Sequence, residues 1–244
     1  MDILYILGTG SKHNNIELRW ALRSVEKYCK NIDRVFVVGS DPGFLSDEVI
    51  YIPCEDKFKG KKHKNMLYKI QYAVLNSDIS DDFLVSSDDI ILLKPVDAIT
   101  YPLYYCGKLP EIVDKDINKD SYLYNLYNTR NFLVSHHIPT YKFAQHCIHK
   151  MNKKFFFDNR SLIMQSFDDE YGIEPNCLVC NVIMRDYEIK EHYDHKLMNG
   201  EEEEDNAARI RPNWEEFSVS DEVLNDYTID SINKMYPNKC KWER

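Results

Sequence analysis

Residues 1–95 alternate short apolar runs with segments of helical periodicity, and this alternation constrains the fold more than any other feature. Residues 16–28 and 65–75 carry apolar side chains three or four positions apart, as a helix with one buried face does. Asn14 and Asn15 are candidate N-caps of the first of these helices. The apolar runs are too short for helices; they cover residues 3–7, 35–38, 49–52 and 83–85. The order strand, helix, strand, strand, helix, strand predicts an α/β protein with a mostly parallel sheet.

Small and polar residues follow these predicted strands. Residues 8–11, 39–42 and 86–89 each come directly after an apolar run. Ligands of open parallel sheets bind at the carboxyl ends of the strands, so we expect the three segments to share one rim. Gly8, Thr9 and Gly10 are candidate substrate-binding residues, although this turn alone lacks the glycine pattern of a dinucleotide or Walker loop.

Two adjacent carboxylates, Asp88 and Asp89, come after Ser86 and Ser87 at the end of the last strand. Carboxylate oxygens suit Mg²⁺ or Mn²⁺, and such an ion bridges a protein to the phosphates of a substrate. Nucleotide-sugar transferases use a strand-end acidic motif of this kind. The competing interpretation is a polar turn between two strands, because a second apolar run follows at once.

Three further groups carry candidate chemistry. Arg19 and Arg23 share one face of the first helix and could bind a diphosphate, although an ordinary charged helix surface explains the spacing better. His136 and His137 precede Pro139, and histidine is the usual acid–base group near neutral pH. Arg160 begins a predicted helix and could present a cation to phosphate. The competing interpretations are a polar loop for the histidines and a helix start for Arg160.

The second half of the chain gives weaker signals. The patterns predict strands at 101–107 and 177–183, helices at 141–150, 161–167 and 222–235, and a solvated acidic loop at 201–205. Residues 122–131 are rich in tyrosine and asparagine. Cys177 and Cys180 lie in an apolar run with no second ligand pair at zinc-site spacing, so buried thiols are expected. The pairs His146/His149 and His192/His195 have no evident third ligand, and no metal is expected there.

Composition excludes several classes of function. A net charge of −9 argues against a nucleic-acid binder, although a local basic patch at 57–64 can coexist with an acidic total. No apolar stretch is long enough to span a membrane, and no signal peptide precedes the first strand. The seven cysteines are odd in number and scattered, which predicts reduced thiols and a cytoplasmic protein.

Several of these motifs together resemble the stealth family, which comprises bacterial capsule hexose-phosphate transferases and the catalytic subunit of the lysosomal N-acetylglucosamine phosphotransferase. The segment at 17–27, Glu-Leu-Arg-Trp-Ala-Leu-Arg-Ser-Val-Glu-Lys, is similar to the family's "ELRYSLRSIEK" block. The family's other blocks have looser counterparts in the opening strand at 2–5, in 35–38, in 42–45, in 87–90 ("NDDV"), in 137–139 ("HxP"), in 159–161 and in the tail from 220 to 243.

The resemblance implies a Rossmann-like sheet of the glycosyltransferase-A type and a mixed, helix-containing C-terminal half. It implies a single domain over 1–244, with residues 1–95 binding the donor and residues 96–244 supplying the acceptor and catalytic part. It also implies functional roles for several residues: catalysis by Glu17, Asp89, His137 and Arg160, and metal binding by Asp88, Asp89 and Asp221.

We therefore expect a transferase that uses a nucleotide-activated sugar donor, Mg²⁺ or Mn²⁺, and a glycan acceptor. The favoured reaction is transfer of a hexose phosphate to a glycan hydroxyl, in capsule or surface polysaccharide synthesis. Ser87 stands where the family has asparagine, and the opening lacks the family's usual tryptophan and aspartate. Transfer of the sugar alone by a metal-dependent glycosyltransferase thus stays open. So does a non-catalytic glycan-binding or scaffold protein.

Overall fold

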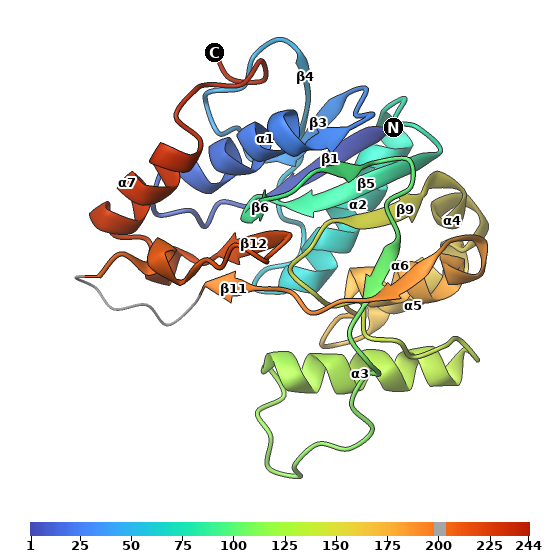
Figure 1. The fold of residues 1–244 in the computed structure, drawn as a ribbon. Helices are drawn as coiled ribbons and strands as arrows, with labels where there is room; N and C mark the ends of the chain where they lie inside the picture. The colour runs from blue at the N-terminus through green and yellow to red at the C-terminus, as the bar shows by residue number, and fades with distance from the viewer. Residues whose placement is uncertain (198–203) are drawn as a thin grey trace.

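A five-stranded sheet forms the centre of the computed structural model, which describes residues 1–197 and 204–244 (Figure 1). The strand order is β4-β3-β1-β5-β9. The strands are β1 (Asp2–Leu7), β3 (Val35–Gly39), β4 (Val49–Pro53), β5 (Asp82–Ser87) and β9 (His149–Asn152). The first four run parallel and β9 runs antiparallel to β5. The predicted α/β architecture with a mostly parallel sheet is confirmed.

Helices cover both faces of this sheet because successive strand residues point to opposite sides. Leu4 of β1 packs into one core with α2 (Lys62–Asn76) and α6 (Pro175–Ile183). Its neighbours Ile3 and Tyr5 pack into a second core with α1 (Ile16–Tyr28). Buried apolar side chains on both faces explain why the strands read as continuous apolar runs.

A small sheet continues from the acidic turn after β5. Its order is β11-β12-β6, with β6 at Ile90–Leu92, β12 at Glu216–Val219 and β11 at Lys196–Leu197. Phe217 of β12 and Ile232 of α7 (Asp226–Met235) share a third core with Trp20 of α1. This sheet brings the C-terminal part of the chain back to the carboxyl ends of β1 and β5.

Among the described residues, the remaining elements are short strands, three further helices and three 3₁₀ turns. They are β2 (Cys29–Lys30), β7 (Val96–Asp97), β8 (Leu103–Tyr105), β10 (Ile189–Glu191), α3 (Tyr122–Ser135), α4 (Lys153–Asp158), α5 (Arg160–Asp168) and the 3₁₀ turns η1 (Met184–Asp186), η2 (Asn206–Arg209) and η3 (Asp221–Val223). Figure 1 shows α3 set apart from the central sheet. Within residues 1–197 and 204–244, no helix has the length and apolar character that a bilayer crossing requires.

Two predicted elements of the second half are wrong. Residues 177–183, predicted as a strand, belong to α6, where Pro175 opens the helix and Glu174 caps it by accepting a hydrogen bond from the Cys177 amide at 2.6 Å. Almost every side chain of α6 is buried, so the run shows no helical period. Residues 141–150, predicted as a helix, form an irregular segment leading into β9, which pairs with the edge of β5.

Other predictions for this half are confirmed. The expected strand at 101–107 contains β8, the helix at 161–167 is α5, and the helix at 222–235 contains α7. Most of the acidic run, at 201–203, lies outside the described residues. All seven cysteines are free thiols, and Cys177 and Cys180 are fully buried.

Candidate functional site

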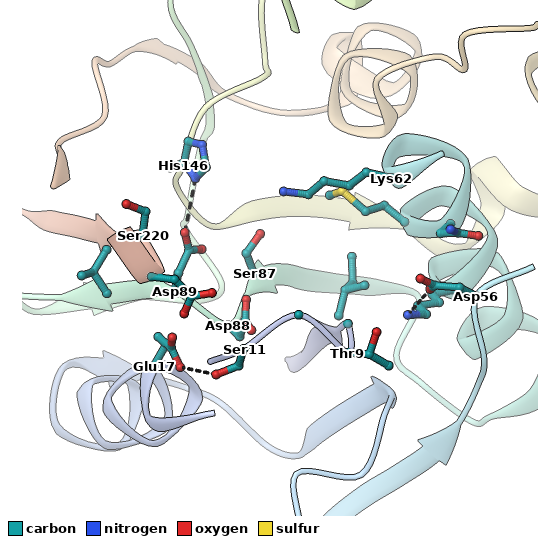
Figure 2. A pocket seen from close by; sticks show the side chains of 18 of the residues that line it. Thr9, Ser11, Glu17, Asp56, Lys62, Ser87, Asp88, Asp89, His146 and Ser220 are labelled. Carbon is teal, nitrogen blue, oxygen red and sulfur yellow. Dashed lines mark hydrogen bonds and ion pairs between the residues drawn. The ribbon is translucent and has the colours of Figure 1, made fainter. Parts of the chain in front are cut away.

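A pocket of about 570 Å³ lies where β1, β5 and β12 end (Figure 2). The three strand ends meet there because β1 pairs with β5, and β12 returns along β6. The polar lining comprises residues 8–11, Glu17, Asp56, residues 60–62, Asn65, Lys69, residues 87–89, His146, Lys196, Ser220 and Asp221. The sequence-predicted residues Gly8, Thr9, Gly10, Glu17, Asp88, Asp89 and Asp221 are therefore brought together in one cavity.

Carboxylates from three segments line one side of this pocket. Glu17 comes from the first turn of α1, Asp88 and Asp89 follow β5, and Asp221 follows β12. Burial, together with a contact from Asp221 and the charge of Asp88, raises the pKa of Glu17 to about 7. Burial and the charge of Asp89 raise the pKa of Asp88 to about 7. Like charges this close resist simultaneous ionisation, and a bound cation would relieve the repulsion.

The carboxylate oxygens fit a hard divalent cation. Within the described residues, Asp89 Oδ1 and Asp221 Oδ1 are buried without a hydrogen-bond partner. Among the same described residues, no group of three or more His, Cys, Asp or Glu side chains could by itself hold a metal ion. A cation here would therefore take one or two protein carboxylates and complete its shell with water and substrate phosphate, the usual arrangement for Mg²⁺.

The turn before α1 fixes Glu17. Asn14 and Asn15 both adopt the left-handed backbone conformation, with φ of 54° and 53°, which asparagine tolerates well. The resulting turn lets Ser11 Oγ accept a hydrogen bond from the Asn15 amide at 3.0 Å and donate one to Glu17 Oε2 at 3.2 Å. Asn15 is the N-cap residue of α1, as predicted, but its side chain makes no capping hydrogen bond.

Amines face the carboxylates across the pocket. Lys62, at the start of α2, makes no ion pair in the described part of the chain, and Figure 2 shows it extending towards Ser87. Lys69 has a different role, since its buried Nζ binds Asp56 Oδ1 at 2.6 Å and the Leu7 carbonyl at 2.9 Å. It thereby ties α2 to the end of β1.

Gly39 permits the close approach of strands that forms the rim. Its φ is 129°, and a Cβ at this position would lie 1.9 Å from the Leu7 carbonyl oxygen. Only glycine can therefore end β3 beside the end of β1. The same Leu7 carbonyl accepts the hydrogen bond from Lys69, so strand spacing and lysine placement depend on one backbone group.

His146 joins the site from the segment before β9, a position that sequence reasoning set aside. Its Nδ1 lies 3.6 Å from Asp89 Oδ2, and its Nε2 lies 3.1 Å from Lys196 Nζ. The His146 amide donates to Asp194 Oδ2 at 2.8 Å. His149 is buried instead, and burial lowers its pKa to about 4. No local pattern distinguishes the two histidines; the path of the chain into β9 does.

Arg19 and Arg23 lie away from the pocket, contrary to the predicted grip on a diphosphate. Arg19 Nη1 and Arg23 Nη2 each bind Glu243 Oε2 at 2.8 Å, and Arg23 Nε binds Glu243 Oε1 at 2.6 Å. The Glu243 side chain is fully buried. Arg23 also donates to the Tyr236 carbonyl at 2.8 Å. The face of α1 that carries the arginines packs on the C-terminal segment, whereas Glu17 points into the pocket.

His136, His137 and Arg160 are not among the residues that line the pocket. His136 follows α3 and its Nε2 lies 2.9 Å from Gln165 Oε1 of α5. His137 adopts a left-handed conformation with φ of 57° in the turn that ends α3. Arg160 is the first residue of α5. The three residues therefore belong to the α3–α5 region and not to the strand ends that carry the carboxylates.

Comparison with known proteins supports the fold. No family model matches the chain, and no curated protein matches it, so the resemblance to the stealth family is not confirmed. A crystal structure of an active-site mutant of LgtC matches with a TM-score of 0.50 and 10% identity, covering 99% of this chain and 98% of that one. LgtC is a glycosyltransferase of the glycosyltransferase-A type. The chain thus has a glycosyltransferase-A-type fold over essentially its whole length.

Proposed function

We propose that this protein is a metal-dependent glycosyltransferase that uses a nucleotide-sugar donor. One observation carries the proposal: carboxylates at the end of β5 face lysines across a pocket at the strand ends of a glycosyltransferase-A-type fold. A nucleotide diphosphate needs cations on several sides, since its phosphate oxygens carry negative charge. A pocket that holds both a cation-binding wall and fixed amines can supply them.

One or two of the carboxylates Asp88, Asp89 and Asp221 would hold Mg²⁺ or Mn²⁺. When bound, the ion would neutralise charge on the diphosphate as the leaving group departs. Lys62 and Lys196 line the same pocket and can bind phosphate oxygens as point charges. Gly8 and Gly10 have no side chains, so the backbone of this turn leaves room for the nucleoside. Thr9 and Asp56 can hydrogen-bond its hydroxyl groups.

Glu17 is our candidate for the group that takes the proton of the acceptor hydroxyl. A general base works best when its pKa is near the working pH, and the pKa of Glu17 is raised to about 7. Glu17 also lines the pocket, where the acceptor must meet the donor. His137, the other candidate base from the sequence, lies outside the pocket lining.

Hexose-phosphate transfer is the second candidate, supported by the resemblance of residues 17–27 and 87–90 to the stealth family. The two reactions break different bonds. Sugar transfer breaks the bond between the anomeric carbon and the diphosphate oxygen and releases a nucleoside diphosphate. Sugar-phosphate transfer breaks the bond between the two phosphates and releases a nucleoside monophosphate. We favour sugar transfer because His137 and Arg160, which the resemblance assigns to phosphate transfer, do not line the pocket.

A thermal-shift screen of UDP-, GDP-, ADP- and dTDP-sugars, with Mn²⁺ and with EDTA, tests the proposal. A ligand of the folded state raises the melting temperature by mass action, so we expect one donor class to raise it with Mn²⁺ only. Chromatography of the nucleotide released in the presence of acceptor glycans then separates the two reactions. A protein that binds no nucleotide sugar under either condition would fit the non-catalytic glycan-binding or scaffold alternative instead.

A further inference from the structure

Three half-buried tyrosines form an aromatic cluster beside the pocket, which the donor site does not use. Tyr124 and Tyr127 lie one turn apart on α3, and their ring centroids are 6.1 Å apart. Tyr171, from the segment between α5 and α6, meets Tyr124 edge-on at 5.0 Å. We call Tyr124, Tyr127 and Tyr171 the tyrosine platform. All three residues are half-buried, and the amines of Lys61 and Lys119 lie 5.7 and 6.0 Å from the centre of the Tyr171 ring.

The platform is rigidly built. Asp169 Oδ1 accepts hydrogen bonds from Asn128 Nδ2 at 2.9 Å and from the Tyr171 and Gly172 amides at 2.9 and 2.8 Å. Asn125 Nδ2 donates to the Gly172 carbonyl at 2.7 Å. The asparagines in the tyrosine-rich stretch thus bind the Tyr171 loop to α3. Rings held in place before binding lose little conformational entropy when a ligand arrives.

Lys61 connects the platform to the pocket. Lys61 lines the pocket, and its Nζ lies 5.7 Å from the centre of the Tyr171 ring and 3.8 Å from Asp120 Oδ1. Gly172 lies against Lys64 in the first turn of α2, where a Cβ would come within 3.0 Å of Lys64 Cγ. The tyrosine platform is therefore continuous with the rim where α2 begins.

Some partly or fully buried tyrosines of the chain use their hydroxyls to bind the protein, whereas the buried Tyr5 does not. Tyr51, Tyr187 and Tyr236 donate to Gly39, Asp82 and Leu92 respectively. Within residues 1–197 and 204–244, the hydroxyls of Tyr124, Tyr127 and Tyr171 make no hydrogen bond to the protein. Flat apolar faces combined with free hydroxyls suit a ligand that is apolar on one face and rich in hydroxyls at its edges, which describes a pyranose ring.

We propose that the tyrosine platform binds the acceptor glycan, with sugar rings stacked on the tyrosines and the reacting hydroxyl directed over Lys61 into the pocket. This inference rests on the proposed sugar-transfer function and adds the acceptor subsite to it. Asp120 and Lys61 at the edge can bind sugar hydroxyls, as polar groups do around an aromatic binding surface.

A printed glycan array probed with the fluorescently labelled full chain tests the proposal, using wild type and Y124A, Y171A, Y171F and Y227A. Tyr227 is an exposed tyrosine of α7 and serves as the matched control. We expect Y124A and Y171A to weaken glycan binding about tenfold, the contribution of one aromatic contact. Y171F keeps the ring and should stay within about twofold, and Y227A should match wild type.

Nucleotide-sugar thermal shifts on the same variants separate this inference from the proposed function. Y171A should keep the donor-induced, Mn²⁺-dependent shift, which also shows that it folds. The proposed glycan-binding role of the platform is refuted if wild type binds no glycan on the array, or if Y124A and Y171A both bind as wild type does. Tyrosine-dependent glycan binding without any donor-induced shift would instead refute the proposed transferase and leave the glycan surface standing.

Discussion

Helix α1 carries two charged regions with opposite surroundings: one lies among other carboxylates, and the other is paired with a buried carboxylate. At its first turn, Glu17 lies among other carboxylates, and burial with a contact from Asp221 raises its pKa to about 7. Further along, Arg19 and Arg23 meet the buried Glu243 in three short ion-pair contacts. Burial alone would raise the pKa of Glu243, but the hydrogen bonds from Arg23 and Arg19 outweigh it and lower that pKa.

The difference indicates which charges hold the fold and which act on a ligand. The Glu243 charge is fully compensated within the chain, so its loss should cost stability. Among the described residues, no lysine or arginine forms an ion pair with Glu17, Asp88, Asp89 or Asp221, so these carboxylates strain the folded state and their loss should cost function and leave stability equal or higher.

The largest effect is expected for Asp89→Asn. The amide keeps the shape of the side chain but removes one charge from the acidic wall, so Mn²⁺-dependent donor binding should fall at least ~100-fold while the melting temperature is unchanged or higher. Isothermal titration calorimetry, with the donor identified in the thermal-shift screen, measures this loss of donor binding. Donor binding with unaltered metal dependence in this variant would remove the basis of the proposed site.

Glu243→Ala should be strongly destabilising. Arg23, whose side chain is only 13% exposed, would lose its partner inside the protein, and breaking a buried pair costs about 3–5 kcal/mol. Urea unfolding measures the free energy. Asp158→Ala is the matched control, because its partner Lys154 is 81% exposed and such surface pairs contribute about 0.3–0.5 kcal/mol. Equal costs for the two variants would contradict the contrast between buried and exposed pairs.

Glu17→Gln should stabilise the protein in a pH-dependent way. An acid whose pKa is higher in the folded than in the unfolded state costs stability as pH rises from the unfolded value, 4.5, to the folded value, about 7. The variant should therefore match wild type near pH 4.5 and exceed it above pH 7 by about 1–2 kcal/mol, a figure reduced because the pocket is open to water. Melting curves between pH 4.5 and 8 measure the difference. A constant difference across this range would show that Glu17 does not titrate as described.

The smallest effect is expected for His137→Gly. If His137 is the catalytic base implied by the stealth resemblance, turnover should fall ~10²–10⁴-fold. Because His137 lies outside the pocket lining, we expect turnover to change by no more than about twofold. Glycine also suits the left-handed backbone at this position, so stability should hold or rise by about 0.5–1 kcal/mol. Steady-state kinetics with matched donor saturation decides between the two expectations.

The sequence predicted the parts of the site that depend on local pattern. Asp88, Asp89 and the Gly8–Gly10 turn could be placed because each directly follows an apolar strand, and parallel strands end at one edge. Asp221 was reached only through the family resemblance. His146, Lys196 and Asp56 were missed, because nothing within a few residues of them indicates which side of the sheet their segment crosses. Their places depend on long-range pairing, such as that of β9 with β5.

The limits of local sequence pattern also explain why the elements at 141–150 and 177–183 were wrongly predicted and why Arg19 and Arg23 were expected at the pocket. A fully buried helix such as α6 has no polar face, so its apolar run cannot be told from a strand by period. Arg19 and Arg23 were correctly placed on one helix face, but the sequence near α1 does not reveal that Glu243 will cover it.

The pairing of Arg23 with Glu243 also bears on how the chain folds. The two residues are 220 positions apart, so the contact closes one of the longest loops the chain can form. Contacts of such high sequence separation form slowly, and β1, α1 and β3 can associate before the C-terminal segment arrives. We therefore expect this ion pair to be missing from the folding transition state. Changes at Glu243 should then accelerate unfolding and leave the rate of folding nearly untouched.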